Sequence, residues 1–68
     1  MITRHVWGTA RDGRRILGFF TFSDGMVTVT VPGYPGRKVA QASDLTNAHV
    51  LAMSMVRELV EDVEAKPQ

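Results

Sequence analysis

Hydrophobic and polar residues alternate in three runs in the first half of the chain, at about residues 3–10, 15–22 and 27–31. Two Asp-Gly pairs, at 12–13 and 24–25, separate the runs. Alternation with a period of two is typical of strands that bury one face. Asp-Gly favours two-residue hairpin turns in which both residues have a positive φ angle. The pattern therefore predicts an antiparallel meander of three strands.

Counting outward from each turn predicts which residues face each other across the hairpins. With residues 12 and 13 at the centre of the first turn, Trp7 faces Gly18 and His5 faces Phe20. The second turn places Phe20 opposite Val29. One face is then almost wholly apolar and is expected to form the core, with the indole of Trp7 covering Gly18. This predicted core face consists of Trp7, Ile16, Phe20, Phe22, Val27, Val29 and Val31.

The outer face of the sheet is expected to be mostly polar, with threonine and arginine side chains. Val6, Leu17 and Phe19 are exceptions that form one apolar cluster in the predicted register. Exposed apolar clusters mark contact sites more often than scattered apolar residues do. We therefore expect Val6, Leu17 and Phe19 to form an interaction surface.

A proline- and glycine-rich segment, residues 32–36, ends the third run. Pro35-Gly36 suits the two central positions of a type II turn. Residues 37–42 could return as a short fourth strand at the edge of the sheet, where Arg37 and Lys38 would discourage pairing with other chains. The sequence leaves the existence of this fourth strand open.

The last part of the chain predicts an amphipathic helix over about residues 45–65. Ser43, Asp44 and Thr46 each qualify as its N-cap, and Pro67 ends the pattern. Most apolar residues fall on one side, whereas Val50 and Leu51 fall among the polar ones. The predicted fold is α+β: a three-stranded, or with residues 37–42 four-stranded, antiparallel meander packed on one C-terminal helix. We expect a single domain over residues 1–68, with the sheet at about 3–42 and a short disordered C-terminal tail.

Size and composition indicate what else stabilises the fold. The chain has 68 residues and no cysteine, which excludes disulfides and thiolate zinc sites. In domains this small, apolar burial only about matches the conformational entropy lost on folding. Self-association, most simply as a homodimer, is therefore the expected additional source of stability. No apolar run reaches the length of a membrane span, and we expect a cytoplasmic protein without membrane contact.

The net charge of +1 hides an asymmetry along the chain. Residues 1–42 carry six basic and two acidic side chains, whereas residues 43–68 carry two basic and five acidic ones. A basic sheet beside an acidic helix could bind an anion. The two could also attract each other between two copies of the chain.

Candidate catalytic residues are few. His5 and His49 are both predicted to point into the layer between sheet and helix, where they could form a metal or proton-transfer pair. No carboxylate is placed by the sequence to orient either ring, and the alternative is that each ring lies at the margin of that layer. Asp12 and Asp24 are explained by their turns. We therefore expect no enzymatic activity, catalytic residue, metal or cofactor.

Basic residues near the first turn suggest a second function class. Phe19 and four arginines, Arg4, Arg11, Arg14 and Arg15, could contact nucleic acid through the hairpin and the outer face. In element order and basic hairpins, the layout resembles the small DNA-binding domains of plant AP2 factors and of tyrosine integrases. The resemblance implies that the sheet would lie in the major groove of DNA. Our first expectation remains a self-associating protein–protein interaction domain with an unidentified protein partner, and nucleic-acid binding is the alternative.

Overall fold

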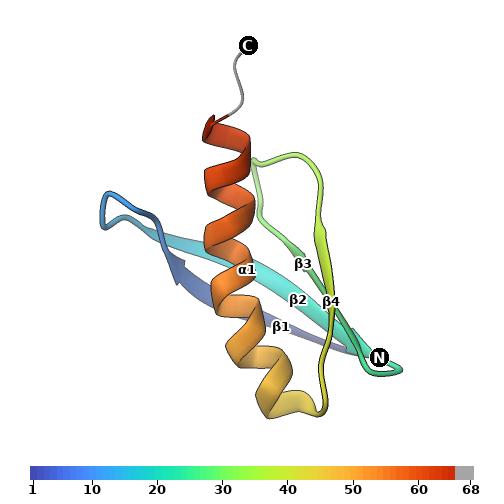
Figure 1. The fold of residues 1–68 in the computed structure, drawn as a ribbon. Coiled ribbons are helices and arrows are strands. Elements are labelled where there is room, and N and C mark those ends of the chain that lie inside the picture. The colour runs from blue at the N-terminus through green and yellow to red at the C-terminus, as the bar shows by residue number, and fades with distance from the viewer. Residues whose placement is uncertain (66–68) are drawn as a thin grey trace.

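The computed structural model describes residues 1–65 as one antiparallel sheet covered on one face by one helix (Figure 1). The strands lie side by side in chain order, so the predicted α+β meander with a C-terminal helix is confirmed. The fourth strand, which the sequence left open, pairs with the third. The expected disordered tail lies outside the described residues. The elements are β1 (Ile2–Thr9), β2 (Arg15–Ser23), β3 (Met26–Thr30), β4 (Lys38–Gln41) and α1 (Leu45–Ala65).

The turn between β2 and β3 has the predicted form. Asp24 and Gly25 have φ angles of 53° and 75°, as a two-residue hairpin turn requires. Phe20 accordingly lies opposite Val29. The predicted register of β2 against β3 is therefore correct.

The turn between β1 and β2 is one residue longer than predicted. The N–H of Gly13 donates to the carbonyl of Ala10 (2.9 Å), and the N–H of Ala10 donates to the carbonyl of Arg14 (2.8 Å). Gly13 has a φ of 93°, and the Asp12 carboxylate accepts a hydrogen bond from the N–H of Arg14. These contacts describe a three-residue loop with a glycine bulge, which is the next most common hairpin connection.

The longer turn shifts β1 by one residue and exchanges its two faces. Val6 lies opposite Gly18, and Trp7 lies opposite Leu17. Val6 is therefore buried at 1% exposure, whereas Trp7 is 47% exposed on the outer face. The predictions that Val6 belongs to an exposed surface and Trp7 to the core are wrong, because Asp-Gly fits both turn lengths.

Two glycines let α1 approach the sheet closely. A Cβ atom on Gly18 would lie 2.7 Å from Cγ2 of Val56, and one on Gly8 would lie 2.8 Å from Cγ1 of the same valine. Both distances are shorter than van der Waals contact. Val56, rather than the indole of Trp7, therefore covers Gly18.

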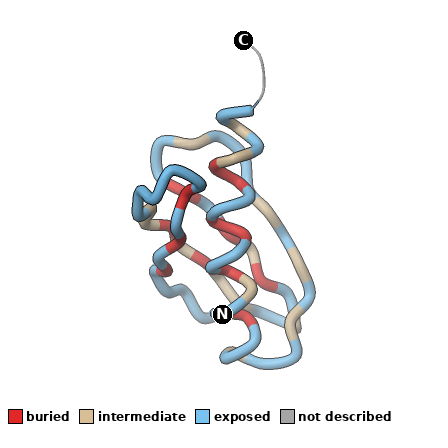
Figure 2. The backbone as a smooth tube through the Cα atoms, turned by 60° about the vertical axis from the view of Figure 1, so that its left-hand side comes forward, coloured by how far each residue is buried: buried red, intermediate tan, exposed pale blue. Residues whose placement is uncertain are grey.

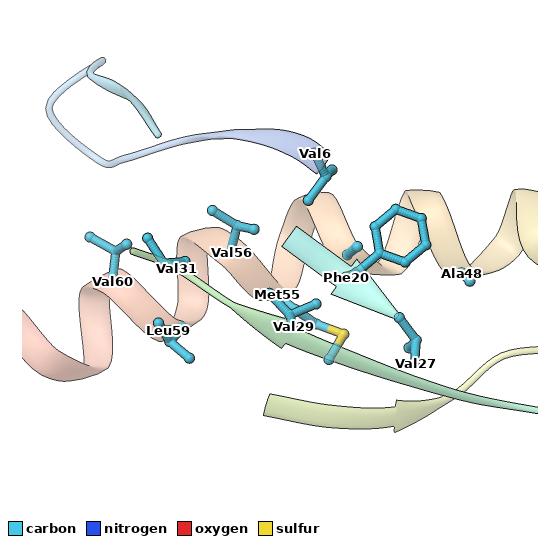
Figure 3. Packing of buried hydrophobic residues seen from close by; sticks show 11 residues of the cluster. Val6, Phe20, Val27, Val29, Val31, Ala48, Met55, Val56, Leu59 and Val60 are labelled. Atoms are coloured by element: carbon cyan, nitrogen blue, oxygen red, sulfur yellow. The ribbon is translucent and has the colours of Figure 1, made fainter. Parts of the chain in front are cut away.

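The core lies between the sheet and α1, and Figure 3 shows Val6 of β1, Phe20 of β2 and the valines of β3 beside the helix. In Figure 2, buried residues recur among exposed ones along the strands and along the helix. Phe20 is fully buried here, as predicted, while Phe19 on the other face is only partly buried. The buried cluster comprises Val6, Phe20, Val27, Val29, Val31, Ala48, Ala52, Met55, Val56, Leu59 and Val60.

Local contacts define the start of α1. Of the three candidate N-caps, Asp44 has the capping contact, because its carboxylate accepts a hydrogen bond from the N–H of Asn47 (2.8 Å). The Asn47 side chain in turn accepts one from the N–H of Ser43 (3.0 Å). These contacts satisfy backbone donors at the start of the helix that have no intrahelical partner.

The segment before β4 makes its hydrogen-bonded turn at Pro32-Gly33. The N–H of Tyr34 donates to the carbonyl of Val31 (3.0 Å), and Gly33 has a φ of 85°. Proline followed by glycine at positive φ is a type II arrangement. Gly36, expected at the third position of such a turn, also has a positive φ, of 84°.

Candidate interaction surface

The outer face of the sheet carries an apolar cluster with aromatic rings. His5 lies edge-on to Phe19, with their ring centroids 6.3 Å apart. The guanidinium of Arg15 lies 4.8 Å from the centre of the Trp7 ring, within the range of a cation–π contact. We define the outer cluster as His5, Trp7, Leu17 and Phe19. It retains two residues of the predicted surface, Leu17 and Phe19, and contains Trp7 and His5 in place of Val6.

A second apolar surface runs along the open side of β1, where α1 lies beside the strand. Val50 and Met53 of the helix are 57% and 45% exposed. A hollow of about 200 Å³ at this side is lined by Trp7, Gly8 and Thr9 from the strand and by Met53, Ser54 and Arg57 from the helix. We define the β1 flank as Trp7, Val50 and Met53. The sequence signal for it was Val50, an apolar residue among polar neighbours on the helix.

The four arginines proposed for nucleic-acid binding do not gather on one surface. Arg15 lies on the outer face, whereas Arg4 is on the α1 side of β1 and lines a hollow with His49. Arg14 bonds to the carboxylates of Asp12 and Glu64, at 2.7 and 2.9 Å. Arg11 lies 3.8 Å from a carboxylate oxygen of Glu61. The expectation that Arg4 lies on the outer face with Arg15 and Phe19 is wrong, because the one-residue shift of β1 places Arg4 on the same face as Phe20.

Basic residues of the first part of the chain form ion pairs with acidic residues of α1 within one copy of the chain. Arg11 and Arg14 at the hairpin face the acidic end of α1. On the other side of the helix, Nζ of Lys38 lies 2.7 Å from a carboxylate oxygen of Asp62. The basic sheet and the acidic helix therefore attract each other inside the fold.

The ionisation of these groups follows from their hydrogen bonds. Hydrogen bonds from Arg14, and then from the Tyr34 hydroxyl, lower the pKa of Glu64. Hydrogen bonds from Arg14 also lower the pKa of Asp12. The hydrogen bond to Asp62 raises the pKa of Lys38, and the bonds to Glu64 and Asp12 raise that of Arg14. Asp12, Arg14 and Glu64 are exposed and Lys38 is partly exposed, so solvent screens these contacts.

We expect the hairpin–helix ion pair to weaken in acid. A carboxyl whose pKa is lowered by folding contributes stability that is present above its unfolded pKa and is lost as the pH falls through its folded pKa. The ordinary pKa is 4.5 for Glu64 and 3.8 for Asp12. This stabilisation should therefore be lost at pH values below about 4.5. Urea unfolding from pH 7 to pH 3 should show a shallower decline for Glu64→Gln than for the unaltered chain. Identical declines would contradict this assignment.

The two histidines lie on opposite sides of the sheet, so the prediction that both point into one layer is wrong. His5 is on the outer face, whereas His49 on α1 lies edge-on to Phe20 with ring centroids 5.7 Å apart. In the part of the chain that the structure describes, no three histidine, cysteine or acidic side chains are placed to hold a metal ion. No helix among residues 1–65 is long and apolar enough to cross a membrane.

Comparison with known proteins does not extend these observations. No family model matches the chain, and neither the curated proteins nor the solved structures contain a match.

Proposed function

We propose that this chain is a small, non-enzymatic protein–protein interaction domain that associates with a second copy of itself. The observation that carries the proposal is the β1 flank: Val50 and Met53 of α1 are about half exposed on the helix side of β1, and Trp7 is about half exposed on the outer face of the same strand. Apolar side chains grouped in this way mark contact surfaces, and their burial stabilises an assembly in proportion to the area removed from water.

The size of the domain supports the same proposal. One helix covers one face of the sheet, and the buried cluster is built largely from valine and alanine. A 68-residue chain without cysteine has no disulfide to supplement such a core. Association through the β1 flank would add apolar burial. We also propose a cytoplasmic location, since a cysteine-free chain would draw no disulfide stabilisation from an oxidising compartment; fractionation of host cells tests it.

Sedimentation equilibrium at micromolar concentrations tests self-association. The unaltered chain should sediment with twice the monomer mass, and Met53→Lys should weaken the dimer at least about tenfold. Lysine matches methionine in helix propensity, so this change should leave α1 intact. Burial of an unpaired ammonium group is what should disrupt the contact.

Val39→Lys is the matched control, because Val39 is 53% exposed on β4, at the other edge of the sheet. This variant should remain dimeric. A monomeric unaltered chain would contradict the proposal, and equal effects of the two substitutions would exclude the β1 flank as the contact.

Nucleic-acid binding remains the second candidate function. The observation in its favour is Arg15, whose guanidinium lies over an exposed indole on the open face of the sheet. The ion pairs of Arg14 and Arg11 weigh against it, since they engage two of the four proposed arginines. Failure of the chain to retard duplex or single-stranded DNA or RNA at low salt would exclude this function.

A further inference from the structure

We infer that β1 of one copy pairs antiparallel with β1 of a second copy, around a twofold axis at Val6. The two four-stranded sheets would then form one sheet of eight strands. The inference rests on the proposed self-association and identifies its contact. We call this strand pairing the β1 seam.

The open edge of β1 can be identified from the hydrogen bonds of the first hairpin. Both the N–H and the C=O of Ala10 bond toward β2. In an antiparallel strand, the main-chain N–H and C=O groups of successive residues point alternately to one neighbouring strand and to the other side. The groups of Gly8 and Val6 therefore also face β2. The main-chain N–H and C=O groups of the odd-numbered residues of β1 therefore face away from β2. Within residues 1–65 no strand pairs with this edge of β1. These residues are Thr3, His5, Trp7 and Thr9.

This edge has few of the features that protect edge strands from pairing. β1 is eight residues long, contains no proline and pairs with β2 without interruption from Ile2 to Thr9. The opposite edge differs, because β4 has only four residues and carries a lysine. Short, lysine-bearing edges resist pairing, whereas long, regular edges favour it. The sheet is thus protected at one edge and open at the other.

A register centred on Val6 overlaps the whole strand. It pairs Thr3 with Thr9 of the second copy, and His5 with Trp7 of the second copy. The four outward-facing residues of each copy would then exchange about eight main-chain hydrogen bonds. Arg4 would lie opposite Gly8 of the second copy, so no like charges face each other across the β1 seam.

The same register joins the two outer clusters. His5 lies beside Phe19 and Trp7 lies beside Leu17 within each copy. Across the seam, His5 would contact Trp7 of the second copy, so each row of side chains runs from Phe19 of one copy to Leu17 of the other. Cross-strand pairs of aromatic side chains stabilise antiparallel sheets.

The position of α1 fits this arrangement. Val56 lies over Gly8 and Gly18, so at this point the helix lies above the space between β1 and β2. Two such helices would be separated by about two strand spacings across the seam, roughly 10 Å, which is a normal packing distance. A twofold axis normal to the sheet makes them antiparallel. Met53 and Val50, exposed on the side of α1 toward the open edge, would be covered by the helix of the second copy.

Proline at position 5 tests the β1 seam. His5→Pro removes an N–H that faces away from β2, so the pairing of β1 with β2 should survive. His5→Ala is the matched control, because it removes the same imidazole and keeps the N–H. In sedimentation equilibrium we expect His5→Ala to remain a dimer and His5→Pro to dissociate at least about tenfold more readily.

The other outcomes distinguish the two proposals. If the unaltered chain is a dimer and His5→Pro is an equally strong one, the β1 seam is wrong and another contact, such as stacking of the outer faces, holds the copies together. If the unaltered chain is monomeric, the proposed function fails together with the seam. If circular dichroism shows that His5→Pro does not fold, the comparison of Thr3→Pro with Thr3→Ala decides by the same criterion.

Discussion

Replacing Phe20 with aspartate is expected to unfold the domain. The side chain of Phe20 is fully buried between the sheet and α1, where an unpaired carboxylate finds no compensating partner. The lost apolar contact and the buried charge together should cost more than about 4 kcal/mol, a large part of the stability of a small domain. The far-ultraviolet circular dichroism spectrum of Phe20→Asp should therefore be that of an unfolded chain. A cooperative thermal transition near that of the unaltered chain would contradict the assigned core.

Phe19→Asp is the control for this prediction. Phe19 is the next residue of β2 and lies on the outer face, partly buried against His5. The carboxylate would remain in contact with water there, so this variant should fold with a loss of about 1 kcal/mol. Chemical denaturation measures the free energy of unfolding of both variants.

Replacing Gly18 with alanine is expected to destabilise the domain by about 1 to 3 kcal/mol. The added methyl group would lie 2.7 Å from Cγ2 of Val56 and 3.1 Å from the carbonyl oxygen of Thr30. Either α1 must move outward or the valine must leave its position. Urea unfolding should show the loss as a lower midpoint with an unchanged slope.

A double-mutant cycle identifies the cause of that loss. Val56→Ala removes the atom that the new methyl group would strike, so the double variant should be less destabilised than the sum of the single ones. Gly33→Ala serves as control, because Gly33 has a positive φ and open space around its Cα, so its cost arises from the backbone alone. Val56→Ala should not reduce the destabilisation that Gly33→Ala causes. Additive effects of Gly18→Ala and Val56→Ala would contradict the close approach of the helix.

The fold could be predicted from the sequence except for the faces of β1 and the existence of β4. Asp24-Gly25 formed the expected turn, and the apolar arc of the helix identified α1 with its actual bounds. Asp12-Gly13 did not form the expected turn, because the Arg14 N–H bonds to the Asp12 carboxylate and one more residue enters the loop. A single residue in the loop exchanged the two faces of β1.

The candidate site was predicted in part for the same reason. Leu17 and Phe19 belong to β2, whose register against β3 was correct, and both lie on the outer face. Trp7 was missed because it belongs to the shifted strand. Gly8 was the residue that could have indicated which face of β1 is buried, because it lies beneath Val56 as Gly18 does. That indication can be recognised only when the position of α1 is known. Local patterns do not contain that information.

Amide hydrogen exchange along β1 tests the β1 seam most directly. At a concentration where the chain has the mass of a dimer, the N–H groups of His5 and Trp7 should exchange as slowly as that of Val6. On dilution to the monomer, the exchange of His5 and Trp7 should accelerate, while Val6 stays protected by its bond to β2. Rapid exchange of His5 and Trp7 in a solution of dimers would contradict the pairing of the two strands.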